Sequence, residues 1–527
     1  MKIVVAEKIA ANAVQVLKEE PTWIVVTHDQ LGGDLAAALV DADALIVRSA
    51  VQVDGKMLSG AKKLRVVGRA GVGVDNIDVD AATKAGIAVM NTPGANAVAV
   101  AEHTLALMLG LARHIPRAAS TTRAGKWEKK SLEGQELRGK TLGIIGLGRI
   151  GLEVARRARA FDMKLVAHDP FVTAAIAREH GIELAERDAV FAVADYISLH
   201  VGLTAQTAGM INEKSLAKMK RGVQIVNCAR GELVDEAALA AALASQHVAG
   251  AALDVFTEEP PKNSPLPALE NVLATPHIAG STSEAQSAVG VQIASQIREY
   301  LKHGVIQNAV NMPSIDDEQY AQMEPYLALA EKLGAFLANV VSGGIQEISI
   351  RYGGRINEWK TELVRNAAIQ GVLNQSIAER ANVVNAAAIA QESGIHVSES
   401  KEQESRNVKA TDSISVGLKT TTGEHHVRGA VLHANSLRLL GVDNIGIEVP
   451  LEGNLIYIRN RDVPGVVGKV GSLLGHHGVN IANFALGRIG PDADAMAVVQ
   501  VDAPAPEAVL QKLRELVEIQ EVRAIQL

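Results

Sequence analysis

The first half of the chain alternates short apolar runs, rich in β-branched residues, with longer stretches rich in alanine and leucine. Ten such runs occur between KIVVAE at residues 2–7 and NVLATPHIAG at residues 271–280. Continuous apolar strands separated by helices are typical of parallel sheets that are covered on both faces. Because ten strands are too many for one such unit, the pattern predicts two doubly wound α/β domains. One comprises residues 1–95 and 282–310, and the other, residues 96–281, is inserted into it.

The second half of the chain has a different pattern. A proline, turn-forming residues and an acidic cluster at residues 311–319 mark a break. Residues 312–449 begin with a helical stretch and become richer in Ser, Thr, Glu and Gln, which favours a mixed α+β domain. After a linker at residues 450–454, the order of elements in residues 454–527 reads strand, helix, strand, strand, helix, strand. This βαββαβ order predicts a ferredoxin-like sandwich.

Composition limits the class of protein. The chain has 527 residues, of which 48% are hydrophobic, so it can form several cores and is not largely disordered. The net charge is −7 and Lys and Arg form no long runs, which argues against nucleic acid or an anionic membrane as a partner.

Cysteine content and the apolar runs bear on location. The single cysteine, Cys228, excludes an internal disulfide and a cysteine-built metal site, and we expect no metal site. Glu7 and Lys8 interrupt the first apolar run too early for a signal peptide, and no apolar stretch reaches the length of a membrane span. We therefore expect a cytoplasmic protein.

A glycine-rich turn predicts a dinucleotide site. Gly146, Gly148 and Gly151 directly follow the apolar run TLGII and open a helical pattern. In this motif the glycines allow a tight turn, close approach of a pyrophosphate, and close packing of helix on strand, and the helix N-terminus receives the phosphate charge. Asp169 ends the next strand, 18 residues past Gly151, where its carboxylate can bind ribose hydroxyls and would repel a 2′-phosphate. The motif therefore favours NAD over NADP, and the alternative is a tight turn with a purely structural role.

A second glycine cluster lies between Gly68 and Asn76. Its spacing does not match the dinucleotide motif, so a loop that needs small residues explains its glycines. Arg69 within it is a charged residue at the carboxyl end of a parallel strand, where ligands bind in such sheets.

Three further charged residues follow apolar runs. Arg230 follows VQIVNCA, Glu259 follows AALDVFTE, and His277 follows NVLATP. Parallel strands that end on one side of a sheet would bring these residues to one cleft. Oxidation of a 2-hydroxy acid needs such a set, because Arg binds a carboxylate through a planar fork, His takes the hydroxyl proton, and a carboxylate orients the His. Taken alone, each residue has a structural alternative: a core histidine, a helix-cap acid and a solvated loop charge.

Five motifs occur in the order of a known family: GRAGVGVDNID, GLGRIG, NCARGELVDE, AALDVFTEEPP and TPHIAGST. Together they resemble the D-isomer-specific 2-hydroxyacid dehydrogenases, and the resemblance covers residues 1–305. It implies that Arg230, Glu259 and His277 are catalytic, and that residues 96–281 form the Rossmann NAD-binding domain inserted in a substrate domain. The positions that the resemblance assigns to NAD contacts, beyond the glycines, are Arg149, Ile150, Asp169, Cys228, Asp254 and Gly280.

One position departs from the family pattern. The family often has His-x-Pro after the fourth Rossmann strand, whereas this chain has His200-Val201-Gly202. The loop beside the cofactor therefore has a different composition.

The two C-terminal domains are similar to those of the long-form D-3-phosphoglycerate dehydrogenases, namely an intervening domain and an ACT domain. This likeness implies NAD-dependent oxidation of 3-phosphoglycerate to 3-phosphohydroxypyruvate, the first step of the phosphorylated serine pathway, with 2-oxoglutarate reduction as a side activity. The phosphate needs a second cationic site, which the likeness assigns to Arg48, Ser49 and Arg69. Lys129 and Lys130 are weaker candidates, because a solvated charge run also explains them.

The ACT-like segment implies regulation. Asn460, Asp462 and Asn480 match positions that bind L-serine between two copies of such domains, so we expect serine feedback and at least a homodimer, by resemblance a tetramer. The alternative is that Asp462 caps a helix and Asn480 forms a turn at a strand edge. The intervening domain is proposed to bind anionic effectors in related enzymes, but its sequence offers no candidate residues.

Two rival functions remain open. One is a hydroxypyruvate or glyoxylate reductase of the same family, which usually lacks the C-terminal tail. The other is an NAD-sensing binding protein built on the same fold.

Overall fold

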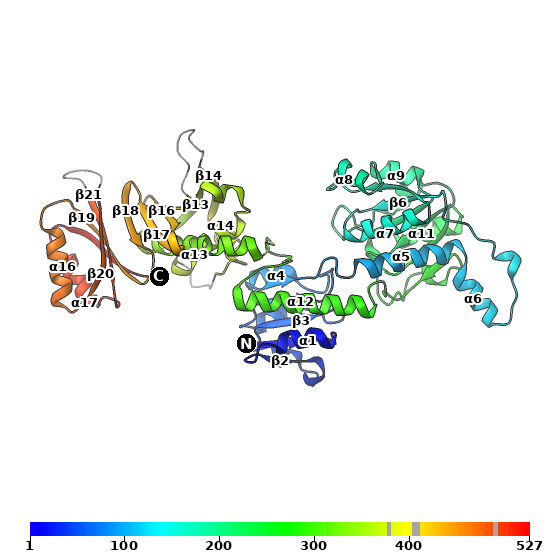
Figure 1. The fold of residues 1–527 in the computed structure, drawn as a ribbon, viewed down its shortest axis with the longest axis horizontal. Helices are drawn as coiled ribbons and strands as arrows, with labels where there is room; N and C mark the ends of the chain where they lie inside the picture. The colour runs from blue at the N-terminus through cyan, green and yellow to red at the C-terminus, as the bar shows by residue number, and fades with distance from the viewer. Residues whose placement is uncertain (314, 316, 377–380, 403–411, 489–493) are drawn as a thin grey trace.

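The structure, a computed structural model, describes residues 1–313, 315, 317–376, 381–402, 412–488 and 494–527. Four sheets follow one another along an elongated molecule (Figure 1). Two of the sheets are parallel, one is mixed and one is antiparallel. The predicted fold class is confirmed.

The first sheet has five parallel strands in the order β2-β1-β3-β4-β5. Its strands are β1 (Lys2–Val5), β2 (Ile24–Val26), β3 (Ala44–Val47), β4 (Val66–Arg69) and β5 (Ala88–Met90). The accompanying helices are α1 (Ala11–Lys18), α2 (Leu35–Leu39), α3 (Gly55–Gly60), α4 (Val79–Lys84) and α12 (Ser283–His303).

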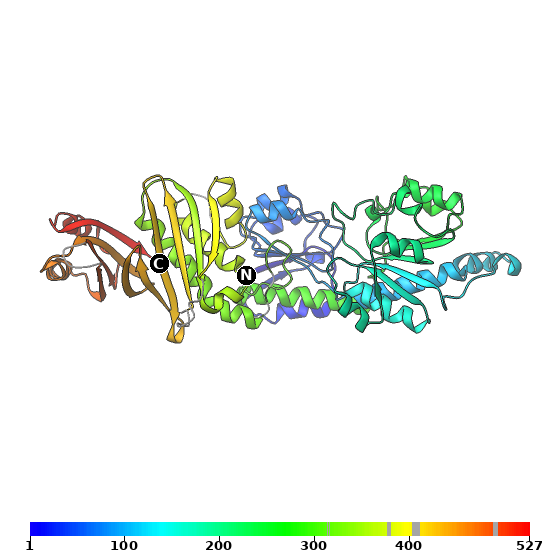
Figure 2. The ribbon, with the colours of Figure 1, turned by 90° about the horizontal axis from the view of Figure 1, so that it is seen from above.

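Helix α12 packs on this first sheet, beside α1, although the whole second domain separates them in sequence (Figure 2). A Cβ at Gly68 of β4 would lie 2.5 Å from the Ile297 side chain and 2.7 Å from that of Ile293. Glycine is therefore needed where the helix meets the strand. Because α12 comes back to this sheet, the chain crosses twice between the first two domains.

The second sheet has seven parallel strands in the order β12-β11-β10-β9-β6-β7-β8. The strand order reverses between β6 and β9, which is where ligands bind in doubly wound sheets. Its strands are β6 (Thr141–Ile145), β7 (Lys164–His168), β8 (Glu183–Leu184), β9 (Tyr196–Leu199), β10 (Val223–Asn227), β11 (Val248–Leu253) and β12 (Val272–Ala274). Its helices are α5 (Ala97–Ala112), α6 (Ile115–Arg123), α7 (Arg149–Ala160), α8 (Ala174–Glu179), α9 (Arg187–Val193), α10 (Glu213–Leu216) and α11 (Glu236–Ala244).

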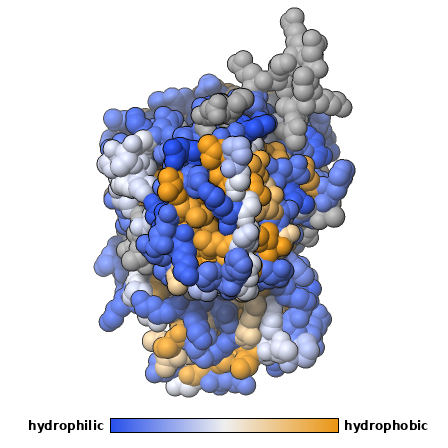
Figure 3. Space-filling view, turned by 90° about the vertical axis from the view of Figure 1, so that its left-hand side faces the viewer, coloured by the Kyte–Doolittle hydropathy of each residue, from blue (hydrophilic) through white to orange (hydrophobic). Residues whose placement is uncertain are grey.

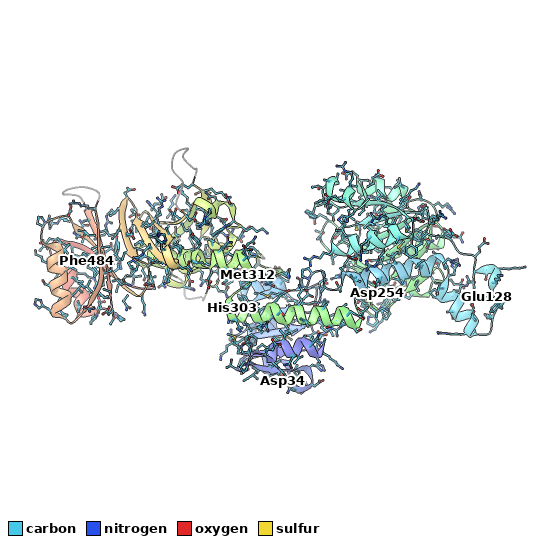
Figure 4. All side chains as sticks on the ribbon, in the orientation of Figure 1. Asp34, Glu128, Asp254, His303, Met312 and Phe484 are labelled. Atoms are coloured by element: carbon cyan, nitrogen blue, oxygen red, sulfur yellow. The ribbon has the colours of Figure 1, made fainter. Side chains whose placement is uncertain are left out.

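An arm formed by α6 and the loop after it extends away from this domain, and Glu128 marks its far end (Figure 4). Trp127 on the arm is 85% exposed. Lys129 and Lys130 lie beside Glu128, on the side of the domain away from the first sheet. Within one chain, the structure does not bring these two lysines to the first domain.

The third sheet has six strands in the order β14-β13-β15-β16-β17-β18, and only the β13–β14 pair is parallel among its described strands. Its strands are β13 (Ile345–Gly353), β14 (His396–Lys401), β15 (Ser413–Thr420), β16 (Glu424–Leu432), β17 (Ser436–Val442) and β18 (Ile445–Pro450), and its helices are α13 (Asp317–Val340), α14 (Glu362–Ser376) and α15 (Ala386–Glu392). Asn382 donates to the Gly86 carbonyl at 2.8 Å and Glu392 lies 3.1 Å from Lys84. These contacts attach the third domain to the first.

The fourth sheet is antiparallel, in the order β20-β21-β19-β22. Its elements are β19 (Asn454–Arg461), α16 (Val466–His476), β20 (Ile481–Arg488), β21 (Asp494–Val501), α17 (Glu507–Arg514) and β22 (Ile519–Gln526). The predicted βαββαβ order is confirmed. Figure 3 looks onto this end of the molecule, where apolar residues gather on the surface. Large apolar side chains that this domain exposes are Val463, Val467, Leu486 and Val517.

Within the described ranges, no single helix is long and apolar enough to cross a membrane. The pair α5 and α6, bent by 65°, reaches the necessary length and composition. Most of α5 is buried in the structure.

Candidate active site between the two parallel-sheet domains

The glycine turn after β6 has the geometry that a dinucleotide requires. Gly146 has a φ of +96°, and a Cβ there would lie 2.5 Å from the His200 carbonyl oxygen. A Cβ at Gly151 would overlap the Gly146 carbonyl, so α7 packs against the turn without any side chain between them. At Gly148 nothing lies within 4 Å of an added Cβ, so the space over the helix N-terminus is open. This arrangement fits a pyrophosphate bound at the first turn of α7.

Asp169 lies beside the same turn. It follows β7, and its two carboxylate oxygens accept hydrogen bonds from the backbone N–H groups of Leu147 and Phe171, each at 2.8 Å. These bonds fix the carboxylate next to the glycines. Its remaining lone pairs can accept from ribose hydroxyls, so the residues present fit NAD.

The other predicted cofactor residues have varied surroundings. Arg149 donates to the Pro93 carbonyl, in the linker between the first two domains. Ile150 packs against the core under α7. Burial raises the pKa of the Cys228 thiol to about 12, so this thiol is not nucleophilic at neutral pH. Gly280 lies against Asn96 at the start of α5.

His277 and Glu259 form a close pair. His277 Nδ1 lies 2.7 Å from Glu259 Oε2, and the other Glu259 oxygen accepts from the Phe256 N–H at 3.2 Å. His277 has a φ of +53°, in the left-handed region of backbone conformation, within the turn after β12. The carboxylate fixes Nδ1 as the protonated nitrogen, so Nε2 is free to take a proton from a ligand. This is the geometry of a general base with an orienting acid.

Asp254, labelled in Figure 4, is completely buried. Its carboxylate accepts from Thr275 Oγ1 at 2.6 Å and from the N–H groups of Ile278 and Ala279 at 2.9 and 2.8 Å. Burial alone would raise the pKa of Asp254, but hydrogen bonds from His103, Thr275 and these backbone groups outweigh burial and keep it low. The Asp254 carboxylate thus holds the 275–279 turn that carries His277.

Arg230 reaches across to the first domain. Its Nε and Nη2 both lie 2.9 Å from Asp75 Oδ2, in the loop after β4. A Cβ at Gly231 would overlap the Phe256 backbone. The Arg230 loop is therefore packed directly against the loop that leads to Glu259. The structure thus places the three predicted catalytic residues after three adjacent strands, at their carboxyl ends, with His277 and Glu259 in contact and the Arg230 side chain on Asp75 of the first domain.

Arg48 and Ser49 follow β3, and Arg69 ends β4 beside them. Glu7 accepts from the N–H groups of residues 48, 50 and 51 at 2.8–3.2 Å, which fixes this loop. Burial, followed by repulsion from Arg230, lowers the pKa of Arg69 to about 10, while Asp75 and Glu7 oppose this. The buried Arg69 Nε has no hydrogen-bond partner in the described part of the chain. Arg48 and Arg230 each lie close enough to Arg69 to repel its charge, and a dianionic ligand would relieve that repulsion.

Family models match three parts of the chain. The NAD binding domain of the D-isomer specific 2-hydroxyacid dehydrogenases matches residues 105–279. The D-3-phosphoglycerate dehydrogenase intervening domain matches residues 322–443, and the ACT domain matches residues 454–518. The predicted family and the predicted cofactor, NAD, are confirmed.

Relatives match over the full length. A D-3-phosphoglycerate dehydrogenase from Methanocaldococcus jannaschii is 40% identical over 528 residues, which cover 100% of both chains. One from Bacillus subtilis is 36% identical over 526 residues, covering 100% of this chain and 99% of that one. The chain belongs to the D-3-phosphoglycerate dehydrogenase family.

Solved structures resemble part of this family member. A glyoxylate reductase from Paecilomyes thermophila has a TM-score of 0.54 and 33% identity, and covers 60% of this chain and 99% of its own. An NAD-dependent formate dehydrogenase from Staphylococcus aureus, solved in complex with NAD, has a TM-score of 0.53 and 29% identity over 60% of this chain and 100% of its own. The family's two C-terminal domains account for chain length beyond that of these enzymes.

The predicted effector residues of the ACT domain are not all together in one chain. Asn460 is buried, and its Oδ1 has no hydrogen-bond partner among the described residues. Asp462 lies 3.3 Å from Arg488. Asn480 instead donates to Asp502 at 2.7 Å.

Strand register gives the separation of these effector residues. Asn460 pairs with Ala495 of β21, whereas Ile481, next to Asn480, pairs with Val501. These two partners are six residues apart on β21, which corresponds to roughly 20 Å. A small ligand that contacts all three residues would therefore need Asn480 from a second copy of the chain.

Sequence reasoning missed several residues at the catalytic site. Asp75 pairs with Arg230. His103 is on α5, and its Nε2 lies 3.2 Å from Thr275 Oγ1 and 3.4 Å from Asp254 Oδ1. Asn96 Oδ1 is buried without a hydrogen-bond partner among the described residues. The short polar stretch Glu102-His103-Thr104 in the mostly apolar α5 was the available signal for His103. Asp75 and Asn96 lie in loops without a periodic pattern, so only their position after a strand could have drawn attention to them.

Proposed function

We propose that this protein oxidises 3-phospho-D-glycerate to 3-phosphohydroxypyruvate with NAD, the first step of the phosphorylated L-serine pathway. The observation that carries the proposal is the combination, around one interdomain site, of the His277–Glu259 pair and of Arg69 with two further arginines, Arg48 and Arg230, close enough to repel its charge. The pair suits removal of a hydroxyl proton, and the arginines suit a substrate with a carboxylate at one end and a phosphate at the other. The family membership agrees with this chemistry.

The reaction divides among a few groups of this chain. Arg230 binds the carboxylate next to the reacting carbon. His277 Nε2 takes the proton from the C2 hydroxyl. Glu259, which contacts His277 Nδ1, stabilises the imidazolium that results. NAD, when bound, accepts the hydride that leaves C2. The glycine turn, Asp169 and α7 would hold the dinucleotide beside β6 and β9.

The phosphate end would bind to the first domain. Arg48, Ser49 and Arg69 lie at the carboxyl ends of β3 and β4, and the orphaned Nε of Arg69 provides a buried donor. Repulsion among the arginines is a cost in the free protein that phosphate binding removes. This gives the phosphorylated substrate an advantage over hydroxypyruvate.

The ACT domain carries the regulatory part of the proposal. Asn460, with its buried orphaned acceptor, and Asp462 would bind the ammonium and hydroxyl of L-serine, and Asn480 of a second copy would complete the site. The form that binds serine is then at least a dimer, and by family resemblance a tetramer. The cytoplasmic location and the domain boundaries at residues 95, 281, 311 and 450 stay predictions.

A hydroxypyruvate or glyoxylate reductase is the second candidate, favoured by the likeness to the glyoxylate reductase structure. NADH oxidation by the purified protein with phosphohydroxypyruvate, hydroxypyruvate, glyoxylate and 2-oxoglutarate separates the two. We expect kcat/KM for phosphohydroxypyruvate to exceed that for hydroxypyruvate by a factor of about 10² or more, because without the phosphate Arg48 and Arg69 would lack the anionic ligand assigned to them. Equal values for the two would favour the reductase, and binding of NADH without turnover would favour the NAD-sensing protein.

A further inference from the structure

Asp75 lies on the first domain and faces the second. It belongs to the loop between β4 and α4, and its side chain is 62% exposed. Its Oδ2 accepts from both Nε and Nη2 of Arg230, each at 2.9 Å. The pair therefore joins the two domains at the residue that would bind the substrate carboxylate.

Asp75 contacts one edge of the Arg230 guanidinium and does not cover the end formed by Nη1 and Nη2. Asp75 contacts the side edge, formed by Nε and Nη2, and Nη1 donates to the Ala229 carbonyl at 2.6 Å. Arginine has two N–H groups on each terminal nitrogen, so Nη1 and Nη2 each keep one N–H. The remaining Nη2 N–H lies at the end of the guanidinium, where it can bind a carboxylate together with Nη1 as an end-on fork.

The backbone around the pair also fixes the guanidinium. A Cβ at Gly73 would overlap Arg230 Nη2, so the side chain lies directly on the glycine loop. Glu7, the other acid near these arginines, is engaged by backbone N–H groups of the 48–51 loop. Within the part of the chain that the structure describes, Asp75 is thus the carboxylate that contacts Arg230.

We infer that Asp75 is a positioning residue that holds Arg230 by its side edge, so that the end-on fork of Arg230 receives the carboxylate of the substrate. The inference rests on the proposed function only in the role of Arg230. Asp75 acts on the carboxylate end, which phosphohydroxypyruvate and hydroxypyruvate share. Its effect on KM should therefore appear with both substrates, although Asp75 also lies close enough to Arg69 to act on the charge of that side chain.

The test uses full-length Asp75→Ala and Asp75→Asn variants, with kcat and KM measured for both substrates at saturating NADH and the Kd of NADH measured by calorimetry. We expect Asp75→Ala to raise KM by about tenfold for both substrates, with a smaller loss in kcat and an unchanged Kd of NADH. Asp75→Asn, which keeps the shape and one acceptor, should have a smaller effect of the same kind. Asp80→Asn is the matched control, because Asp80 is an exposed acid of the same region without an ion pair or side-chain hydrogen bond in the described ranges.

Three results with the variants would overturn the inference. An unchanged KM, or a loss in kcat alone, would show a merely structural role. An effect confined to phosphohydroxypyruvate would assign Asp75 to the phosphate end. An equal effect of Asp80→Asn would show that the change in KM comes from the net charge of the region and not from the contact between Asp75 and Arg230. If the wild type reduces both substrates equally, the proposed function fails. The change in KM from wild type to Asp75→Ala still decides the inference in that case. A wild type that reduces neither overturns both.

Discussion

The catalytic and regulatory ends of the molecule differ in how far one chain completes a site. At the catalytic end, Arg230, Glu259 and His277 follow three adjacent parallel strands, so the sheet alone brings them together. At the ACT end, Asn460 and Asn480 lie at opposite ends of an antiparallel sheet, roughly 20 Å apart. Parallel strands thus concentrate loop residues at one edge, whereas an antiparallel sheet distributes them over both, so a small ligand that contacts Asn460 and Asn480 together would need a second copy of the chain.

The largest effect should come from His277. Replacing it by Asn removes the proton acceptor, so kcat should fall by a factor of about 10²–10⁴ while NADH binding is unchanged. His180→Asn, at an exposed site on the same domain, is the control. Steady-state kinetics and NADH calorimetry are the measurements. A kcat within tenfold of the wild-type value would show that His277 is not the proton acceptor.

A pair of glycine variants sharpens the catalytic side of the comparison. Gly151→Ala places a Cβ on the Gly146 carbonyl, so it should lower both the thermal unfolding temperature and NADH affinity. Gly148→Ala points its Cβ into open space over α7, so it should lower NADH affinity by about tenfold and leave the unfolding temperature unchanged. Calorimetry and thermal unfolding measure the two properties. Equal NADH affinity in Gly148→Ala and wild type would contradict the assigned position of the pyrophosphate.

The smallest expected effect tests the regulatory side. Asn460→Ala and Asn480→Ala should each weaken inhibition by serine by about tenfold without changing kcat. Because each serine site would take Asn460 from one chain and Asn480 from another, refolding the two variants together should restore inhibition in part of the mixed oligomers. Activity against serine concentration is the measurement. Mixed oligomers that respond no better than either variant would place all three residues in one chain's site, or in none.

Much of the fold could be predicted, because its signals are local. Apolar runs gave the parallel strands, and Gly146, Gly148 and Gly151 predicted a turn whose glycines the structure requires. Asp75 could not be found in this way. Its partner, Arg230, belongs to another domain 155 residues away, and a contact between domains leaves no periodic pattern in the sequence.

The ACT residues show a second limit. The motif was enough to identify Asn460, Asp462 and Asn480 as candidates. It could not predict the strand register, which separates Asn480 from the other two. The buried, orphaned acceptor of Asn460 also emerges only from packing. Sequence thus predicts which residues bear chemistry more readily than how many chains they must come from.

The most direct test of the central claim is the selectivity for phosphate in wild type and in Arg69→Ala. The account predicts that Arg69→Ala lowers kcat/KM for phosphohydroxypyruvate by a factor of about 10² and that for hydroxypyruvate by less than about threefold. The preference of the wild type would then largely disappear. Equal losses on both substrates would contradict the claim that the first domain recognises a phosphate through Arg69.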